Sequence, residues 1–279
     1  KMSTTAVTAA AVPTVRRLES AAFVALCLLV GALQISIAVS AVLLTATVGL
    51  WVAVLISHRE RVAGPAMLWP LVTYAALTII SAAASLDPAT SLVDAKEILL
   101  FLIVPVVYRF ARGPRASTIA NIIISVGAVT AVVGIVQYGI LEYDSLGQRP
   151  LGSMGHYMTY SGLLMLVIGL AAGRLLFGSV DRVWVGLILP TLLVALTLTL
   201  TRSAWVGACV AIGLLLVIKD RRLLAATPVV FALLFALAPQ TVIDRAYSTF
   251  DLQDPTNRDR FAMARAGARM IRDHPLAGV

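Results

Sequence analysis

Apolar residues occur along this chain in runs long enough to cross a membrane. A spanning helix needs about 20 apolar residues to cover about 30 Å of hydrocarbon. The runs 21–57 and 183–218 are far longer, and at a rise of about 1.5 Å per residue each exceeds a single crossing. We therefore expect two helices from each run, with turns near Gln34–Ser36 and near Arg202.

Single-length apolar runs complete the pattern. They are 66–85, 97–111, 116–140, 159–177 and 223–239, the last closed by Pro239. The run 97–111 is the shortest of these. The pattern predicts an all-α, polytopic integral membrane protein with about nine transmembrane helices.

Positive charges predict the orientation, because Lys and Arg accumulate in cytoplasmic loops. With a cytoplasmic N-terminus, the inner segments hold twelve cations and the outer loops three. The inner cations are Arg16, Arg17, Arg59, Arg61, Arg109, Arg112, Arg115, Arg174, Arg182, Lys219, Arg221 and Arg222. The outer cations are Lys96, Arg149 and Arg202. We therefore expect a cytoplasmic N-terminus and an extracytoplasmic location for everything after Pro239.

This topology divides the chain into three regions. Residues 1–20 are expected to form a cytoplasmic tail, disordered over its Ala-, Thr- and Val-rich residues 1–15. Residues 21–239 form the transmembrane helical domain, and residues 240–279 begin a large extracytoplasmic loop. The first span resembles a signal peptide, but no convincing small-residue cleavage site is followed by a soluble domain, so we expect it to remain uncleaved.

Composition agrees with a membrane protein and excludes several function classes. Hydrophobic residues make up 59% of the chain, charged residues 13%, and the mean hydropathy is +0.93. The net charge of +8 does not indicate nucleic-acid binding, since arginines flank the apolar runs. No phosphate-binding Gly-rich loop or metal-ligand spacing occurs, and Cys27 and Cys209 lie inside apolar runs.

The outer cations are not explained by the orientation rule. Arg202 follows Leu-Thr-Leu-Thr-Leu-Thr with no loop around it, and an arginine at the hydrocarbon boundary either snorkels to the interface or meets an anion. Arg149 opens a loop whose Gly152 and Gly155 allow close approach of the backbone to another surface or a ligand. His156 is either a proton carrier or a solvated loop residue.

Lys96 lies beside Asp94 and Glu97, where an ordinary surface ion pair is the simplest expectation.

The outer tail predicts one helix, over residues 258–273, preceded by N-cap candidates Asp254, Thr256 and Asn257 and stopped by Pro275. One face carries a basic stripe that could rest on anionic lipid headgroups, made of Arg258, Arg265, Arg269 and Arg272. Arg260 falls outside this stripe, on the small uncharged side. Burial there would require either a salt bridge or an anionic ligand.

Together the outer cations suit a lipid-linked phosphate or diphosphate, because a guanidinium group donates two parallel hydrogen bonds to phosphate oxygens.

Three segments resemble a known family. Thr-Arg-Ser-Ala-Trp-Val-Gly at 201–207 is similar to the Ser-Arg-Gly-type hairpin of the O-antigen ligase and O-antigen polymerase superfamily. Residues 260–279 resemble its arginine-headed helix, which ends in Asp-His-Pro-Leu-x-Gly-Val. Residues 149–156 resemble its Arg-x-x-Gly-x-x-Gly-His stretch. The resemblance covers roughly residues 20–279.

The resemblance implies a C-type glycosyltransferase of the bacterial cytoplasmic (inner) membrane, metal-independent and without a cofactor. Its donor would be a polyprenyl-diphosphate-linked glycan, and its acceptor lipid A–core, another glycan repeat or a protein. By position, Arg202 and Arg260 would hold the donor diphosphate, with Arg149 as a third contact and His156, Lys96 and His274 as supporting residues. Membrane lipids are the other expected partners, and nucleic acid is not one.

The chain departs from the family in two respects. The family's outer loop continues further and carries a proposed catalytic histidine there, so we expect the general base beyond Val279 and a C-terminally truncated chain that is inactive alone. Ala264 stands where the family has tryptophan.

The alternative function is a small-anion transporter or permease. The spans contain no carboxylate in mid-membrane, which a proton-coupled transporter would usually require.

Overall fold

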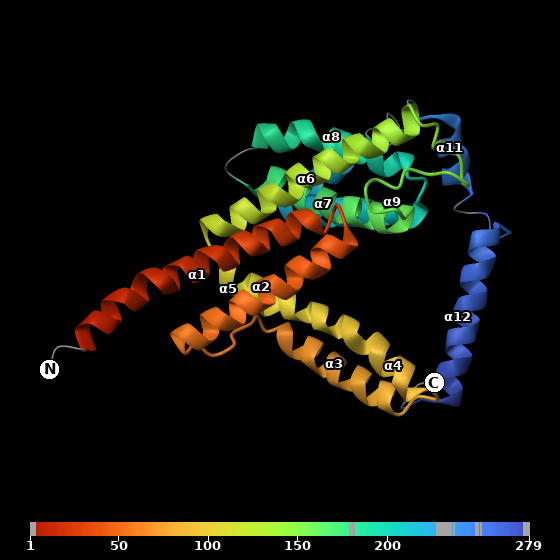
Figure 1. The fold of residues 1–279 in the computed structure, drawn as a ribbon. Coiled ribbons are helices and arrows are strands. Elements are labelled where there is room, and N and C mark those ends of the chain that lie inside the picture. Colours follow the sequence, from red (N-terminus) through yellow and green to blue (C-terminus); the bar gives the residue numbers. More distant parts are fainter. Residues whose placement is uncertain are drawn as a thin grey trace. The chain divides into compact units, whose positions relative to one another are not determined.

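The computed structural model describes residues 4–178, 182–226, 236, 238–248, 251 and 253–275, where all regular elements are helices. The predicted all-α class is confirmed. The helices are α1 (Thr4–Ala32), α2 (Ile37–His58), α3 (Leu68–Ala83), α4 (Pro88–Asp94), η1 (Ala95–Leu102), α5 (Ile103–Phe110), α6 (Pro114–Gly139), α7 (Tyr157–Phe177), α8 (Arg182–Leu198), α9 (Arg202–Lys219), η2 (Arg221–Ala226), α11 (Gln240–Tyr247) and α12 (Pro255–Asp273) (Figure 1).

Both double-length runs turn where the sequence predicts. In the first, α1 ends at Ala32 and α2 begins at Ile37, where the Ser36 hydroxyl accepts a hydrogen bond from the backbone N–H of Val39. Such a side-chain acceptor satisfies one of the open N–H groups in the first turn of a helix. In the second run, α8 ends at Leu198 and Arg202 is the first residue of α9.

Four helices of the described residues are long and apolar enough to cross a membrane: α2, α6, α7 and α9. Helices α3 and α8 are apolar but shorter. The predicted span 223–239 lies largely outside the described residues. The number of nine spans and the orientation of the termini therefore stay predictions.

Helix α9 shows how these helices suit a lipid environment. Apolar side chains recur every four residues along one face and are more than half exposed: Val206, Val210, Leu214 and Ile218. A stripe of this kind is costly in water, whereas lipid tails solvate it. The exposed face of α9 therefore fits the surface of a membrane-spanning helix.

One local expectation is wrong. The run 97–111 is not one α-helix, because a 3-10 segment, η1, precedes the short α5. Pro105 offers a physical reason, since its ring would clash with the carbonyl four residues earlier in a continuous α-helix. It lies instead in the first turn of α5, where a missing N–H is tolerated. Helix α1 begins at Thr4, and the expected disorder of residues 1–15 stays a prediction.

The chain divides into two compact units. One comprises Lys1–Leu26, Val42–Ala116 and Leu252–Val279, and the other comprises Cys27–Ala41 and Ser117–Asp251. We refer to them as unit 1 and unit 2.

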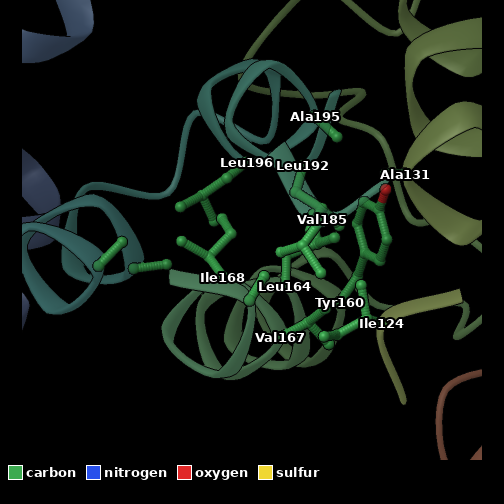
Figure 2. Close-up of a cluster of buried hydrophobic side chains, with 13 residues drawn as sticks. Ile124, Ala131, Tyr160, Leu164, Val167, Ile168, Val185, Leu192, Ala195 and Leu196 are labelled. Atoms are coloured by element: carbon green, nitrogen blue, oxygen red, sulfur yellow. The ribbon is translucent and has the colours of Figure 1, made fainter. Parts of the chain in front are cut away.

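The core of unit 2 is formed by α6, α7, α8 and α9, with α7 contributing the most buried side chains. Figure 2 shows Leu164 and Ile168 of α7 directed toward the side chains of α8, and Tyr160 lying beside Ala131 of α6. Tyr160 is 1% exposed, and its hydroxyl donates to the carbonyl of Thr130 at 2.8 Å. A buried tyrosine hydroxyl needs such a partner.

The residues next to glycines show how these helices are aligned. Three neighbouring pairs show how α7 and α9 align: Met165 with Gly207, Gly169 with Ala211, and Gly173 with Leu215. The residue numbers differ by 42 in each pair, so the two helices run parallel. Helix α6 runs antiparallel to α7, since Gly127 faces Val167 and Gly134 faces Tyr160.

Unit 1 contains a charged clamp around Arg109, the last-turn cation of α5. Its guanidinium donates from Nε and Nη2 to the two carboxylate oxygens of Glu60, at 2.8 and 3.0 Å, and from Nη2 to Glu19 at 2.8 Å. The three residues come from α5, the segment after α2, and α1. The clamp therefore joins three parts of the chain that are distant in sequence.

Candidate anion-binding site

The helix register brings several sequence-predicted site residues to one end of unit 2. Paired residues of α7 and α9 differ by 42 in number, so Arg202 lies level with Tyr160. The loop before α7 and the α8–α9 hairpin are therefore at the same end of unit 2. Helix α11 reaches this end as well, because the Thr241 and Tyr138 hydroxyls are 3.2 Å apart. We call this region, formed by residues 137–156, 199–202 and 240–248, the hairpin end.

The α8–α9 hairpin is tightly bonded within itself. The Leu196 carbonyl accepts hydrogen bonds from the Thr199 hydroxyl at 2.7 Å and from the Trp205 indole at 3.0 Å. Leu200 has a φ of 53°, a left-handed conformation that is uncommon for leucine. This residue reverses the chain, so that Arg202 begins α9 without a surface loop.

Arg202 is buried, with 6% of its surface exposed. Its Nη1 donates to the backbone carbonyl of Ser248 and, at 3.1 Å, to the Ser248 hydroxyl. Arg202 therefore does not simply snorkel away from the protein, which was one of the two expectations for it. Its guanidinium is held inside the hairpin end by the residue that ends α11.

A second buried arginine, Arg245, was not singled out from the sequence. It is 8% exposed, and its Nε donates to the Leu200 carbonyl at 3.3 Å. Arg245 and Val242, the two buried residues of α11, are three positions apart and share one face of this helix. That spacing is the one signal in the sequence, and it is weak in a helix this short.

The loop between α6 and α7 is fixed by Gln137, near the end of α6. Its amide oxygen accepts from the N–H groups of Leu151 and Gly152, at 3.0 and 2.9 Å, and its amide nitrogen donates to the Gly152 carbonyl at 2.8 Å. Gly152 has a φ of 58° and lies against the ring of Tyr160. The sequence predicted that the backbone at this glycine approaches another surface or a ligand closely. In the structure it approaches Tyr160 of the same chain.

Arg149 and His156 flank the ring of Tyr157. The Arg149 guanidinium carbon is 4.3 Å from the ring centre, and its Nε donates to the Leu146 carbonyl at 3.1 Å. The His156 ring stacks on Tyr157 with the ring centres 5.0 Å apart. Arg149 is half-buried and His156 exposed, so both lie at the surface of the hairpin end.

The remaining predicted residues belong to unit 1. Lys96 is exposed at the start of η1, and within the described residues it forms no ion pair with Asp94 or Glu97, so the expected pair is wrong. Arg260 is also exposed, and no residue of α12 is buried, so its guanidinium has no burial that would require a partner.

The predicted start and end of the α12 helix are close to those observed. Asp254 is its N-cap, accepting at 3.0 Å from the Thr256 N–H, and Pro255 is the first helical residue. His274 ends it, donating its backbone N–H to the Met270 carbonyl at 2.9 Å. This bond uses only the backbone of His274, so the supporting role of its side chain stays a prediction.

Residues 185–279 match the family model described as O-antigen ligase. This confirms the resemblance to the O-antigen ligase superfamily over residues 185–279. No curated protein and no solved structure matches the chain. The O-antigen ligase match contains Arg202, Arg245 and Arg260, whereas Arg149 precedes it.

The arginines of the hairpin end are the groups that could bind an anion. Two buried guanidinium groups and one half-buried group occur there, and the three acids of this region, Glu142, Asp144 and Asp244, are exposed. Guanidinium groups stay charged at any physiological pH and form bidentate bonds with phosphate oxygens. No cluster of metal ligands occurs among the described residues.

Proposed function

We propose that this protein transfers a glycan from a polyprenyl diphosphate to an acceptor at the outer face of the bacterial cytoplasmic membrane. The acceptor is lipid A–core, another glycan repeat or a protein. The membrane-type helices and the O-antigen ligase match support glycan transfer in a membrane. The observation that carries the proposal further is the buried Arg202 at the start of a spanning helix, inside the matched segment.

The chemistry expected of Arg202 is electrostatic. When the glycosidic bond breaks, negative charge develops on the diphosphate that leaves. A guanidinium already held in place stabilises this charge without reorganising solvent, and its low-dielectric surroundings strengthen the effect. In this proposal Arg202 contacts the donor diphosphate from the hairpin end.

Arg260 and Arg149 contribute further donor contacts in the proposal. Arg260 is exposed on α12 and thus accessible to a ligand, and Arg149 lies at the surface beside Tyr157. Their expected contributions are smaller than that of Arg202, because exposed charges are screened by water and salt.

The test replaces these arginines in the chromosomal gene and measures two quantities, the lipid-linked glycan that accumulates and the glycan that is transferred to the acceptor. Arg202→Ala should abolish transfer, and Arg260→Ala should reduce it strongly but by less; both should cause the donor to accumulate at unchanged protein abundance. Arg202→Lys should also be impaired, since one ammonium group does not replace the guanidinium fork.

Arg265→Ala is the matched control, because Arg265 is exposed on the same helix as Arg260 but belongs to the basic stripe. It should keep transfer at the wild-type level. Retained transfer in both Arg202→Ala and Arg260→Ala would overturn the assignment of the donor site.

A further inference from the structure

The C-terminal end of α11 is bonded to the hairpin on both sides of Thr201. After Thr201, Arg202 donates to the carbonyl and hydroxyl oxygens of Ser248. Before Thr201, the Leu200 carbonyl accepts from Arg245. Arg245 and Ser248 are separated by one turn of chain, so a single helix end holds both the backbone and the side chain around the predicted donor contact.

Ser248 is itself oriented by Arg245. The Ser248 hydroxyl donates its only proton to the Arg245 carbonyl at 2.9 Å. With this proton used, the hydroxyl oxygen presents lone pairs, and one of these accepts from Arg202 Nη1 at 3.1 Å. The direction of the hydroxyl is therefore set to receive the guanidinium group.

The hairpin needs such support, because Leu200 adopts a left-handed conformation. With a φ of 53°, its Cβ is close to backbone atoms, which disfavours this conformation for any residue with a side chain. Conformations of this kind persist when surrounding groups fix them, and they concentrate at functional sites. The bond from Arg245 Nε to the Leu200 carbonyl is one of the fixing contacts.

We propose that Arg245 and Ser248 are positioning residues that fix the Arg202 guanidinium in the orientation in which it meets the donor diphosphate. This inference rests on the proposed function for the identity of the ligand. Both contacts to Ser248 use Nη1, one corner of the planar guanidinium group, and they restrict the direction of its plane. A group ordered in advance loses less conformational entropy on binding, and affinity rises accordingly.

The test is a pair of double-mutant cycles on the full chain in nanodiscs, with undecaprenyl diphosphate as the probe. Ser248→Ala and Arg245→Met should each weaken binding about tenfold, the loss expected for one hydrogen bond to a charged group. In the Arg202→Ala background neither should weaken it further, because both act through Arg202. Equal weakening in both backgrounds would overturn the proposal.

Two variants separate positioning from a general effect on folding. Ser248→Thr keeps the hydroxyl and should restore binding to within about twofold of wild type, given the small cost of a retained hydrogen bond. Thr78→Ala, which removes a hydroxyl–carbonyl hydrogen bond within α3 and lies outside the hairpin end, should leave binding unchanged. If Ser248→Thr loses as much binding as Ser248→Ala, the hydroxyl does not position Arg202.

A ligand-free measurement distinguishes failure of this inference from failure of the proposed function. If wild type does not bind undecaprenyl diphosphate, the proposed donor is wrong. The same cycles are then scored on thermal unfolding midpoints. Coupled midpoint shifts for Ser248→Ala and Arg202→Ala would support the holding of Arg202 by α11, and additive shifts would overturn it. Ser248→Ala suffices for this test if Arg245→Met does not fold.

Discussion

At the scale of single residues, the loop before α7 depends on two glycines with positive φ angles. Gly152 has a φ of 58° and Gly155 a φ of 72°. A Cβ atom at position 152 would lie 2.5 Å from the ring of Tyr160, whereas one at position 155 would have no neighbour within 4 Å. A residue with a side chain would therefore strain the backbone at either position, but only at position 152 would it also collide with a neighbour.

This difference predicts unequal effects for two otherwise similar substitutions. Gly155→Ala should lower the free energy of unfolding by about 1 kcal/mol, from backbone strain alone. Gly152→Ala should lower it by about 3 kcal/mol, because the ring of Tyr160 must also move. The measurement is chemical unfolding of the two variants in the same detergent. Equal losses would contradict the close packing of Gly152 on Tyr160.

The sequence identified Arg202 but not Arg245, and the reason is physical. Arg202 interrupts an apolar run, and the cost of placing a guanidinium at the hydrocarbon boundary makes it conspicuous without a structure. Arg245 belongs to a polar segment in which an arginine needs no explanation. Its burial arises from α11 packing on the hairpin, a contact between residues 45 positions apart in the chain.

At the scale of helices, local signals determined the ends well. Asp254 and Pro255 have the residue types expected at the start of a helix, and α12 begins there. In the run 97–111 the helix ends were not predicted, because hydropathy does not distinguish a 3-10 helix from an α-helix. The proline within it, Pro105, was the available signal for the break between η1 and α5.

The cap of α12 makes a prediction at this scale. Asp254→Ala removes the acceptor for the Thr256 N–H and should destabilise the first turn by about 1 kcal/mol. Amide hydrogen exchange over residues 256–259 should become faster by about fivefold, the factor that corresponds to this free energy. Asp254→Asn keeps an acceptor oxygen and should exchange nearly as wild type. Unchanged exchange in Asp254→Ala would show that the cap contributes nothing.

At the scale of the whole molecule, the positive-inside rule used Arg109 only as a topological marker. The structure shows that Arg109 also joins Glu19 and Glu60, at 2.8 Å each. This pairing was beyond sequence reasoning, because it depends on how distant helices pack. The hydrogen bonds from the Arg109 guanidinium lower the pKa of the Glu60 carboxyl below its ordinary value of 4.5.

A carboxyl whose pKa is lowered by folding raises the free energy of unfolding when the pH is above its ordinary pKa. This contribution is lost as the pH falls through the lowered pKa. Glu60→Gln should therefore lower the thermal midpoint at pH 7, and the gap between variant and wild type should narrow below pH 4.5. Glu97→Gln, which removes an exposed carboxylate outside the ion pairs of the described residues, serves as control. A difference in thermal midpoint between Glu60→Gln and wild type that does not change with pH would contradict the stabilising contact between Arg109 and Glu60.

The central claim is that the hairpin end binds the diphosphate of a lipid-linked donor, and photo-crosslinking tests it most directly. A polyprenyl diphosphate with a photoreactive group beside the diphosphate is irradiated with the protein in nanodiscs, and labelled peptides are identified by mass spectrometry. We expect labels within residues 149–156, 199–205 and 240–248, suppressed by excess undecaprenyl diphosphate. Suppressible labels confined to residues 219–222, at the opposite end of α9, would contradict the claim.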